Sequence, residues 1–231
     1  KKEFWKNMIN SELQKRILSS IILIPVSFFF IIQGSLTFIF FLSLIFLVTT
    51  LEWFKMTKNK DLLRIFGLFF LFFSFFSTIY IRQYVDLNFF ILFIIICIFT
   101  DTGGYIFGKT FKGPRLTKIS PKKTYSGMIG SFLSPLLVGL IYIKYFGEKS
   151  RFLLETDPLF IILLIIFISL VSQIGDLIIS YFKRKAKLKH TGKILPGHGG
   201  ILDRIDGLIF VMPITYLCVL PILINKLDLI K

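Results

Sequence analysis

Cysteine and histidine are nearly absent from this chain, which has two of each among 231 residues. Cys97 and Cys218 lie inside apolar runs, which indicates small buried side chains rather than a disulfide or a metal-binding pair. With so few thiol and imidazole ligands, zinc is not expected. A bound metal would instead be a hard cation held by oxygen ligands.

Long polar segments, internal repeats and low-complexity linkers are also absent, so no separate soluble domain is expected. Hydrophobic residues make up 55% of the chain and the mean hydropathy is +0.77. Apolar runs recur at the length that crosses a bilayer, and none shows the alternation of a membrane barrel strand. The sequence therefore predicts an all-α, polytopic membrane helix bundle of about seven to nine transmembrane helices.

The apolar runs give seven expected spans. They lie at residues 17–32, 35–51, 65–81, 88–107, 129–146, 158–182 and 205–224. The last contains Pro213 and Pro221, so a kink or break is expected there. We divide the chain into a supporting N-terminal region, 1–100, which offers contacts to lipid or to a second copy, and a catalytic transmembrane region, 101–231, with basic cytoplasmic loops.

Positive charge greatly exceeds negative charge, with 28 Lys and Arg against 13 Asp and Glu and a formal net charge of +15. The cations lie between apolar runs, so the lipid bilayer surface and phosphate ligands are expected partners and nucleic acid is not. Most of them fall in the N-terminal segment and in segments 52–64, 108–128 and 183–204. The positive-inside rule predicts that these four segments are cytoplasmic.

The first candidate site follows Asp101, which lies toward the inner end of a predicted span. An ionised carboxylate there is costly unless it is paired or bound to metal. Glycines and cations follow without another acid, which favours phosphate binding by backbone N–H groups and positive charge. The alternative is a basic loop whose glycines pack helices. The residues are Gly103, Gly104, Gly108, Lys109, Lys112, Gly113, Arg115, Lys118, Lys122 and Lys123.

The second candidate site is a polar face on the sixth apolar run. At about 100° per residue, its polar positions fall on one side of a helix. They are Ser169, Ser172, Asp176, Ser180 and Lys183. Hydrogen bonds between helices account for the serines but not for a carboxylate. Asp176 is therefore expected to bind metal or to pair with a cation.

The third candidate site is the turn at 196–200 and the two acids after it, Asp203 and Asp206. The alternative is that these acids only stabilise a helix N-terminus. Together with Asp101 and Asp176 they form up to four carboxylates, enough for one or two hard cations. His198 either donates to a phosphate or shapes the turn.

Two further residues are interpreted as structural. His190 is expected to be a solvated loop residue. Glu52, beside Trp53 at the end of the second span, is interpreted as part of a membrane-interface anchor, with a contact to the site as the alternative.

These motifs resemble the phosphatidate cytidylyltransferase family, also called the CDP-diacylglycerol synthases. The residues that carry the resemblance are Asp101, Gly104, Tyr105, Gly108, Lys109, Ser120, Pro121, Lys122, Lys123, Thr124, Gly127, Gln173, Gly175, Asp176, Ser180, Lys183, Arg184, Lys189, Gly192, Pro196, His198, Gly199, Gly200, Asp203, Arg204 and Asp206. The chain departs from the family pattern at His190, where the family has Asp, and at Ser126, where Glu is common. The resemblance covers residue 101 to the end.

The resemblance implies an enzyme that converts CTP and phosphatidic acid to CDP-diacylglycerol and pyrophosphate. It further implies a bacterial inner (plasma) membrane, a cytoplasmic active site, and Mg²⁺ with K⁺ as a companion. Metal ligands would be Asp176 and Asp203, and then Asp101 and Asp206. Catalytic roles fall on Asp176, Asp203, Lys183 and Arg204. Substrate contacts fall on Ser120, Lys122, Lys123, Thr124, Ser180, Arg184, His198, Gly199 and Gly200.

Two alternatives stay open from the sequence. A CTP-dependent polyprenol-type lipid kinase shares part of the pattern but would transfer the γ-phosphoryl group and release CDP. An ion or lipid transporter would need polar residues through the whole membrane depth, whereas here they cluster at the inner end. The sequence leaves open the acyl-chain preference, the number of metal ions and the oligomeric state, for which a homodimer is one alternative.

Overall fold

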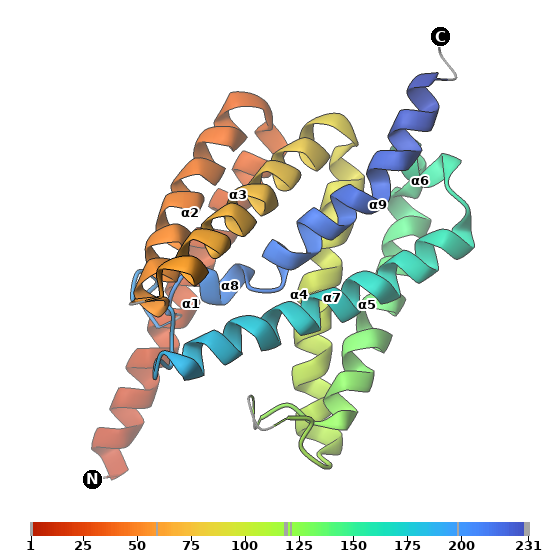
Figure 1. Ribbon diagram of the computed structural model, residues 1–231. Coiled ribbons are helices and arrows are strands. Elements are labelled where there is room, and N and C mark those ends of the chain that lie inside the picture. The colour runs from red at the N-terminus through yellow and green to blue at the C-terminus, as the bar shows by residue number, and fades with distance from the viewer. Residues whose placement is uncertain (1, 59, 118–119, 121, 198, 229–231) are drawn as a thin grey trace.

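The computed structural model describes residues 2–58, 60–117, 120, 122–197 and 199–228; it does not describe the side chains of residues 2–13, 15–16, 151 and 222–228. Within these ranges the regular structure is helical and includes no strand. The helices are α1 (Lys2–Gln33), α2 (Ser35–Met56), α3 (Asp61–Tyr84), α4 (Leu87–Phe111), α5 (Tyr125–Phe146), the 3₁₀ helix η1 (Gly147–Lys149), α6 (Arg151–Glu155), α7 (Pro158–Lys185), α8 (Leu202–Ile205) and α9 (Leu208–Asp228). The all-α prediction is confirmed (Figure 1).

Five of the described helices are long and apolar enough to cross a membrane, namely α2, α3, α4, α5 with η1, and α7. Two shorter apolar helical segments, Ile17–Gln33 and Leu208–Pro221, correspond to the first and last predicted spans. Many large apolar side chains, among them Leu36, Phe66 and Phe69, point outward. In a membrane bundle such side chains face lipid, which supports the prediction of a polytopic membrane protein.

The interruption of the last predicted span lies at its start rather than at its prolines. The short helix α8 ends at Ile205 and α9 begins at Leu208, whereas Pro213 lies inside α9. Gly207 packs directly against Ser172 of α7, and its backbone N–H donates to Asp206 Oδ1 at 3.0 Å. The break therefore places a carboxylate at the junction of two helices in the interior of the bundle.

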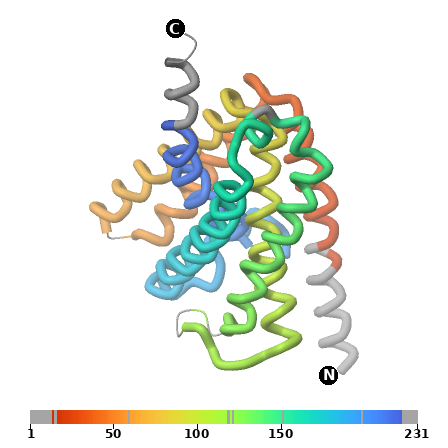
Figure 2. Tube along the Cα trace, turned by 90° about the vertical axis from the view of Figure 1, so that its right-hand side faces the viewer, coloured from red at the N-terminus to blue at the C-terminus, as the bar shows by residue number. Residues whose placement is uncertain are grey.

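Helices α4 and α5 form the closest pair in the bundle and run side by side in Figures 1 and 2. Gly103 faces Gly130, and Gly104 faces Gly127 and Ser131, so closely that a Cβ on Gly103 or Gly104 would overlap the partner helix. Small residues at such contacts let membrane helices approach closely. These glycines therefore pack helices, which is the alternative reading of the Gly-rich motif.

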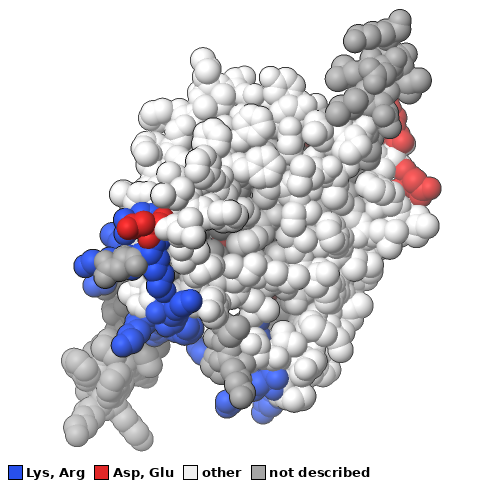
Figure 3. Space-filling view, in the orientation of Figure 1, with Lys and Arg blue, Asp and Glu red and all other residues white. Residues whose placement is uncertain are grey.

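Helices from both halves of the chain pack together. Helix α3 lies against α9, and α7 contacts α4, α5 and α9. On the face shown in Figure 3, the visible Lys and Arg side chains gather at the end where α4 and α7 terminate. The division of function at residue 100 stays a prediction, but the core is shared across it.

Candidate active site

A polar pocket of about 280 Å³ lies between α4, α5, α7 and the loop that joins α4 to α5. Six residues predicted as metal or substrate ligands line it: Asp101, Ser120, Lys122, Lys123, Thr124 and Asp176. Gln173 lines it as well, and its Nε2 has no hydrogen-bond partner among the described residues. The fold therefore brings the first two predicted sites together.

The loop is fastened at both of its ends. Leu116 donates its backbone N–H to the carbonyl of Lys123 at 2.8 Å, and Thr124 caps α5 by accepting from the Gly127 N–H at 3.1 Å. Ser126 donates to the carbonyl of Lys112. Ser126, where the family commonly has Glu, thus helps to fix the loop that carries the lysines.

Asp176 contacts both a cation and a hydroxyl group at the pocket. The Nζ of Lys123 lies 2.6 Å from Asp176 Oδ2, and the Ser180 hydroxyl donates to Asp176 Oδ1 at 3.2 Å. Arg204 lies close enough to Asp101 for the two charges to interact. The prediction that Asp176 pairs with a cation is confirmed by the contact with Lys123.

Asp206 adds a second carboxylate near Asp176, and the two side chains lie close enough to interact. Burial raises the pKa of Asp206 well above its ordinary value, and the negative charges of Asp176 and Asp101 add to this. Lys183, with its Nζ 4.0 Å from Asp206 Oδ2, acts in the opposite direction.

Asp203 is held by donors on three sides. It accepts from Lys183 Nζ at 2.8 Å, from the Thr191 N–H at 2.9 Å and from the Gly200 N–H at 3.1 Å. Burial alone would raise the pKa of Asp203, but these hydrogen bonds, led by that of Lys183, hold it below its ordinary value. Asp203 does not line the pocket, and Lys183 connects it to Asp206.

His190, expected as a solvated loop residue, is indeed half exposed, but its Nδ1 lies 3.7 Å from Asp203 Oδ2. Arg184 points its guanidinium at the carbonyl of Leu188, at 3.5 Å, beyond the end of α7. Gly199 has φ +89° and exchanges backbone hydrogen bonds with Leu195, which closes the turn. His198 lies outside the described residues, so its predicted role stays a prediction.

The carboxylates fit a hard divalent cation in their chemistry. The described residues include no group of three or more His, Cys, Asp or Glu side chains that could hold a metal ion. However, Asp176 and Asp206 lie close enough for their charges to interact, and Asp101 lies nearby. Lys123 and Lys183 offset part of the repulsion between these carboxylates. Carboxylate oxygens are the ligands that Mg²⁺ prefers. Of the four predicted ligands, Asp101, Asp176 and Asp206 thus lie near one another, and their role in metal binding stays a prediction.

Glu52 is a functional candidate that the sequence suggested only as an alternative. Its side chain is buried, at 1% exposure, and accepts from Thr191 Oγ1 at 2.8 Å, from the Leu202 N–H at 2.9 Å and from the Ile201 N–H at 3.1 Å. The interpretation of Glu52 as a membrane-interface anchor is therefore wrong, because its carboxylate faces inward onto the 191–202 loop. The alternative, a contact with the site, is the one observed. Its only sequence signal was an acid at the end of an apolar run.

Comparison with known proteins gives one consistent result. Residues 60–221 match the model of the cytidylyltransferase family. The chain is 36% identical over 222 residues to the phosphatidate cytidylyltransferase of Rickettsia conorii, with 94% of this chain and 95% of the relative covered. It is 36% identical over 206 residues to that of Rickettsia felis, with 87% and 89% covered, and 38% identical over 135 residues to that of Staphylococcus saprophyticus, with 58% and 50% covered. These matches confirm the resemblance and extend it N-terminal to residue 101, where it was expected to begin. The family match includes every predicted site residue.

Proposed function

We propose that this chain, which belongs to the cytidylyltransferase family and is therefore a nucleotidyltransferase, transfers a cytidylyl group from CTP to phosphatidic acid. The products are CDP-diacylglycerol and pyrophosphate. One observation carries the proposal: Lys122, Lys123, Asp101 and Asp176 converge on a single polar pocket at the basic end of a membrane bundle. The names of the relatives, both phosphatidate cytidylyltransferases, support the choice of substrate.

The reaction requires positive charge that stabilises the phosphates more than it requires a general base. An oxygen of the lipid phosphate attacks the α-phosphorus of CTP, and the bond from that phosphorus to the oxygen bridging to the β-phosphate breaks. The attacking oxygen is already anionic near neutral pH, because the second pKa of a phosphomonoester is about 6. The barrier lies in bringing two polyanions together and in the charge that develops on the leaving pyrophosphate.

The residues of this chain fit that requirement. Lys122 and Lys123 place positive charge at the pocket wall, and the hydroxyls of Ser120 and Thr124 lie beside them as hydrogen-bonding groups. Lys123 already lies 2.6 Å from a carboxylate oxygen, so it is oriented into the pocket before any phosphate binds. Positioned cations of this kind stabilise charge without reorganising during the reaction.

For the cofactor we propose Mg²⁺, with K⁺ as a companion, held by Asp176 and Asp206 with Asp101 beside them. A divalent ion there would neutralise charge on the phosphates and on the leaving group. Asp203 accepts hydrogen bonds from Lys183 and two backbone N–H groups. It would therefore hold Lys183 in place beside the metal ligands.

We further propose that the pocket opens to the cytoplasm of a bacterial inner membrane. The basic segments flank the pocket, and the positive-inside rule assigns such segments to the cytoplasm, where CTP is found. Tyr105, on the pocket wall, is 67% exposed on the outer face of α4. This exposure supports lateral entry of the lipid headgroup while its acyl chains stay in the bilayer.

The test uses purified protein with phosphatidic acid, Mg²⁺ and CTP carrying distinct labels on its α- and γ-phosphates. The expected lipid product carries the α-label, and the γ-label is released as pyrophosphate. A lipid kinase would place the γ-label in the lipid and release CDP. That outcome, or the absence of any labelled lipid, would refute the proposed reaction.

A further inference from the structure

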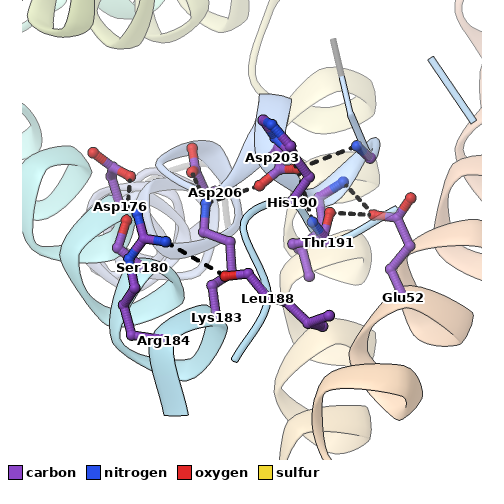
Figure 4. Close-up of polar contacts among 12 residues, drawn as sticks. Glu52, Asp176, Ser180, Lys183, Arg184, Leu188, His190, Thr191, Asp203 and Asp206 are labelled. Atoms are coloured by element: carbon purple, nitrogen blue, oxygen red, sulfur yellow. Dashed lines mark hydrogen bonds and ion pairs between the residues drawn. The ribbon is translucent and has the colours of Figure 1, made fainter. Parts of the chain in front are cut away.

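A continuous set of hydrogen bonds runs from Glu52 on α2, in the N-terminal half of the chain, to Asp203 and Lys183, and an ion pair connects Lys183 to Asp206 (Figure 4). We propose that Glu52 is a positioning residue for the transfer reaction: it fixes the 191–202 loop so that Asp203 and Lys183 keep their places beside the other acids. This inference rests on the proposed function, because it assigns Glu52 a part in the same site.

The first argument is the burial of the Glu52 carboxylate. Taking a carboxylate out of water is costly unless hydrogen bonds replace the lost solvation. At Glu52 three donors do so, Thr191 Oγ1 and the N–H groups of Ile201 and Leu202. All three come from one segment, more than 130 residues away along the chain. The three hydrogen bonds that stabilise the buried carboxylate are therefore the same ones that hold the loop in place.

The second argument is that this loop is shared between two carboxylates. Thr191 donates its hydroxyl to Glu52 and its backbone N–H to Asp203. The backbone at the other end of the loop repeats the arrangement, because the Gly200 N–H donates to Asp203 and the Ile201 N–H donates to Glu52. A shift of Glu52 would move the two backbone donors that help to hold Asp203, the N–H groups of Thr191 and Gly200.

The third argument is the tight fit of the loop on Glu52. A Cβ at Gly192 or Gly200 would overlap the Glu52 carboxylate, so only glycine fits at these two positions. A loop in such contact cannot slide along α2 without losing the hydrogen bonds. From Asp203 the connection continues through Lys183, at 2.8 Å, to Asp206, at 4.0 Å from the same ammonium group.

A positioning role predicts a specific kinetic pattern. Glu52→Gln keeps the size of the side chain but replaces one acceptor oxygen with an N–H donor, and Thr191→Val removes the hydroxyl at nearly constant shape. Each is expected to lower kcat by about 10- to 100-fold, the usual cost when a supporting contact behind a reactive group is lost. The KM for CTP should change less than about threefold, because the lysines of the pocket are untouched. Thr191→Ser, which keeps the hydroxyl, should restore most of kcat.

The controls separate positioning from folding. Asp61→Asn removes an exposed carboxylate near the same end of the molecule, whose contact with Arg64 is 3.2 Å, and should leave kcat unchanged. The double variant Glu52→Gln/Thr191→Val should lose much less than the product of the two single losses, because both break one connection. Unchanged kcat per folded molecule in Thr191→Val, or fully multiplicative losses, would overturn the inference, even if Glu52→Gln fails to fold.

A measurement that does not depend on catalysis tests the role of Glu52 separately from the proposed reaction. Hydrogen exchange of peptides that contain Thr191 and Gly200 should speed up in Glu52→Gln and in Thr191→Val but not in Thr191→Ser. If wild-type protein makes no CDP-diacylglycerol, the proposed function fails while this measurement still decides the role of Glu52 in fixing the loop. Unaltered exchange in both weakened variants would overturn it.

Discussion

The ammonium group of Lys123 lies 2.6 Å from a carboxylate oxygen of Asp176. Lys123 belongs to the loop between α4 and α5, and Asp176 lies on α7, so the contact closes one side of the polar pocket. The basic loop after Asp101 and the polar face of α7, which are separate in the sequence, are thus joined by an ion pair. An anion that enters the pocket meets a lysine already directed toward it and an acid that holds the lysine in place.

Asp176→Asn should abolish turnover while the protein stays folded. Asparagine has nearly the same volume and keeps one carbonyl oxygen for the contact with Lys123, and its amide N–H can donate to the Ser180 hydroxyl, but it removes the negative charge. The loss of a group that organises charge in a site of this kind costs about 10²- to 10³-fold or more in kcat. The measurement is CDP-diacylglycerol formation per folded molecule, with Asp61→Asn as the control. Full turnover in Asp176→Asn would refute the metal assignment.

Lys123→Gln should raise the KM for CTP by about 10- to 100-fold, the value of a hydrogen bond to a charged group of roughly 1.5–3 kcal/mol. Lys123→Arg keeps the positive charge and should recover part of the affinity. Initial rates over a range of CTP concentrations give both constants. A glutamine variant with wild-type KM would exclude Lys123 from the nucleotide site.

Gly104→Ala should destabilise the bundle, because the added Cβ overlaps Ser131 Oγ on α5. Overpacking of this kind costs about 1–3 kcal/mol. The remaining neighbours of that Cβ are ordinary contacts, namely the carbonyl oxygen of Gly127 at 3.5 Å and the Cβ of Ser131 at 3.7 Å. Gly104→Ala/Ser131→Ala should therefore recover most of the thermal stability in detergent. No recovery in the double variant would contradict the close contact of α4 and α5.

The pH dependence of stability should reveal Asp206. Its pKa is raised in the folded protein, so the folded state holds its proton more tightly than the unfolded state. Stability therefore falls as the pH rises above the ordinary carboxylate range, until Asp206 ionises in the folded state. In a buffer that contains a metal chelator, Asp206→Asn should be more stable than wild type at neutral pH. The unfolding temperature of this variant should also change less with pH.

Added Mg²⁺ gives the complementary test of Asp206. A cation that binds only the folded wild type raises its unfolding temperature, and Asp206→Asn should respond much less. An equal response to Mg²⁺ in both proteins would remove Asp206 from the ligand set. Identical pH profiles in the chelator would contradict the buried state of its carboxyl group.

Some features of the site were predictable because they depend on local chemistry. Asp101 and Asp176 lie toward the ends of apolar runs that cross in the same direction, so the sequence alone brings both to one face of the membrane. The same argument failed for Gly103 and Gly104, because glycine serves a phosphate loop and a helix contact equally well. Only the position of α5 distinguishes the two.

Glu52 shows why the rest was not predictable. Its partners Thr191 and Leu202 lie 139 and 150 residues further along the chain, and no spacing rule connects them. Asp203 was expected among the metal ligands, yet its oxygens are taken by Lys183 and by two backbone N–H groups. Every residue except proline has a backbone N–H group, so the sequence does not show which of these groups bind a carboxylate. A turn that encloses a carboxylate and a turn that exposes it can therefore have the same kind of sequence.

The sequence by itself determined that this chain is an α-helical membrane protein whose cations are concentrated at one end of its spans, together with the acids Asp101 and Asp176. That follows because the cost of moving each residue from water into hydrocarbon is set mainly by its own chemistry and sums along the chain. Only the tertiary structure decided which acid meets which cation, and that α2 supplies the carboxylate behind the loop. Such pairings depend on the rotation and crossing of helices, which are fixed by contacts between segments far apart in the chain.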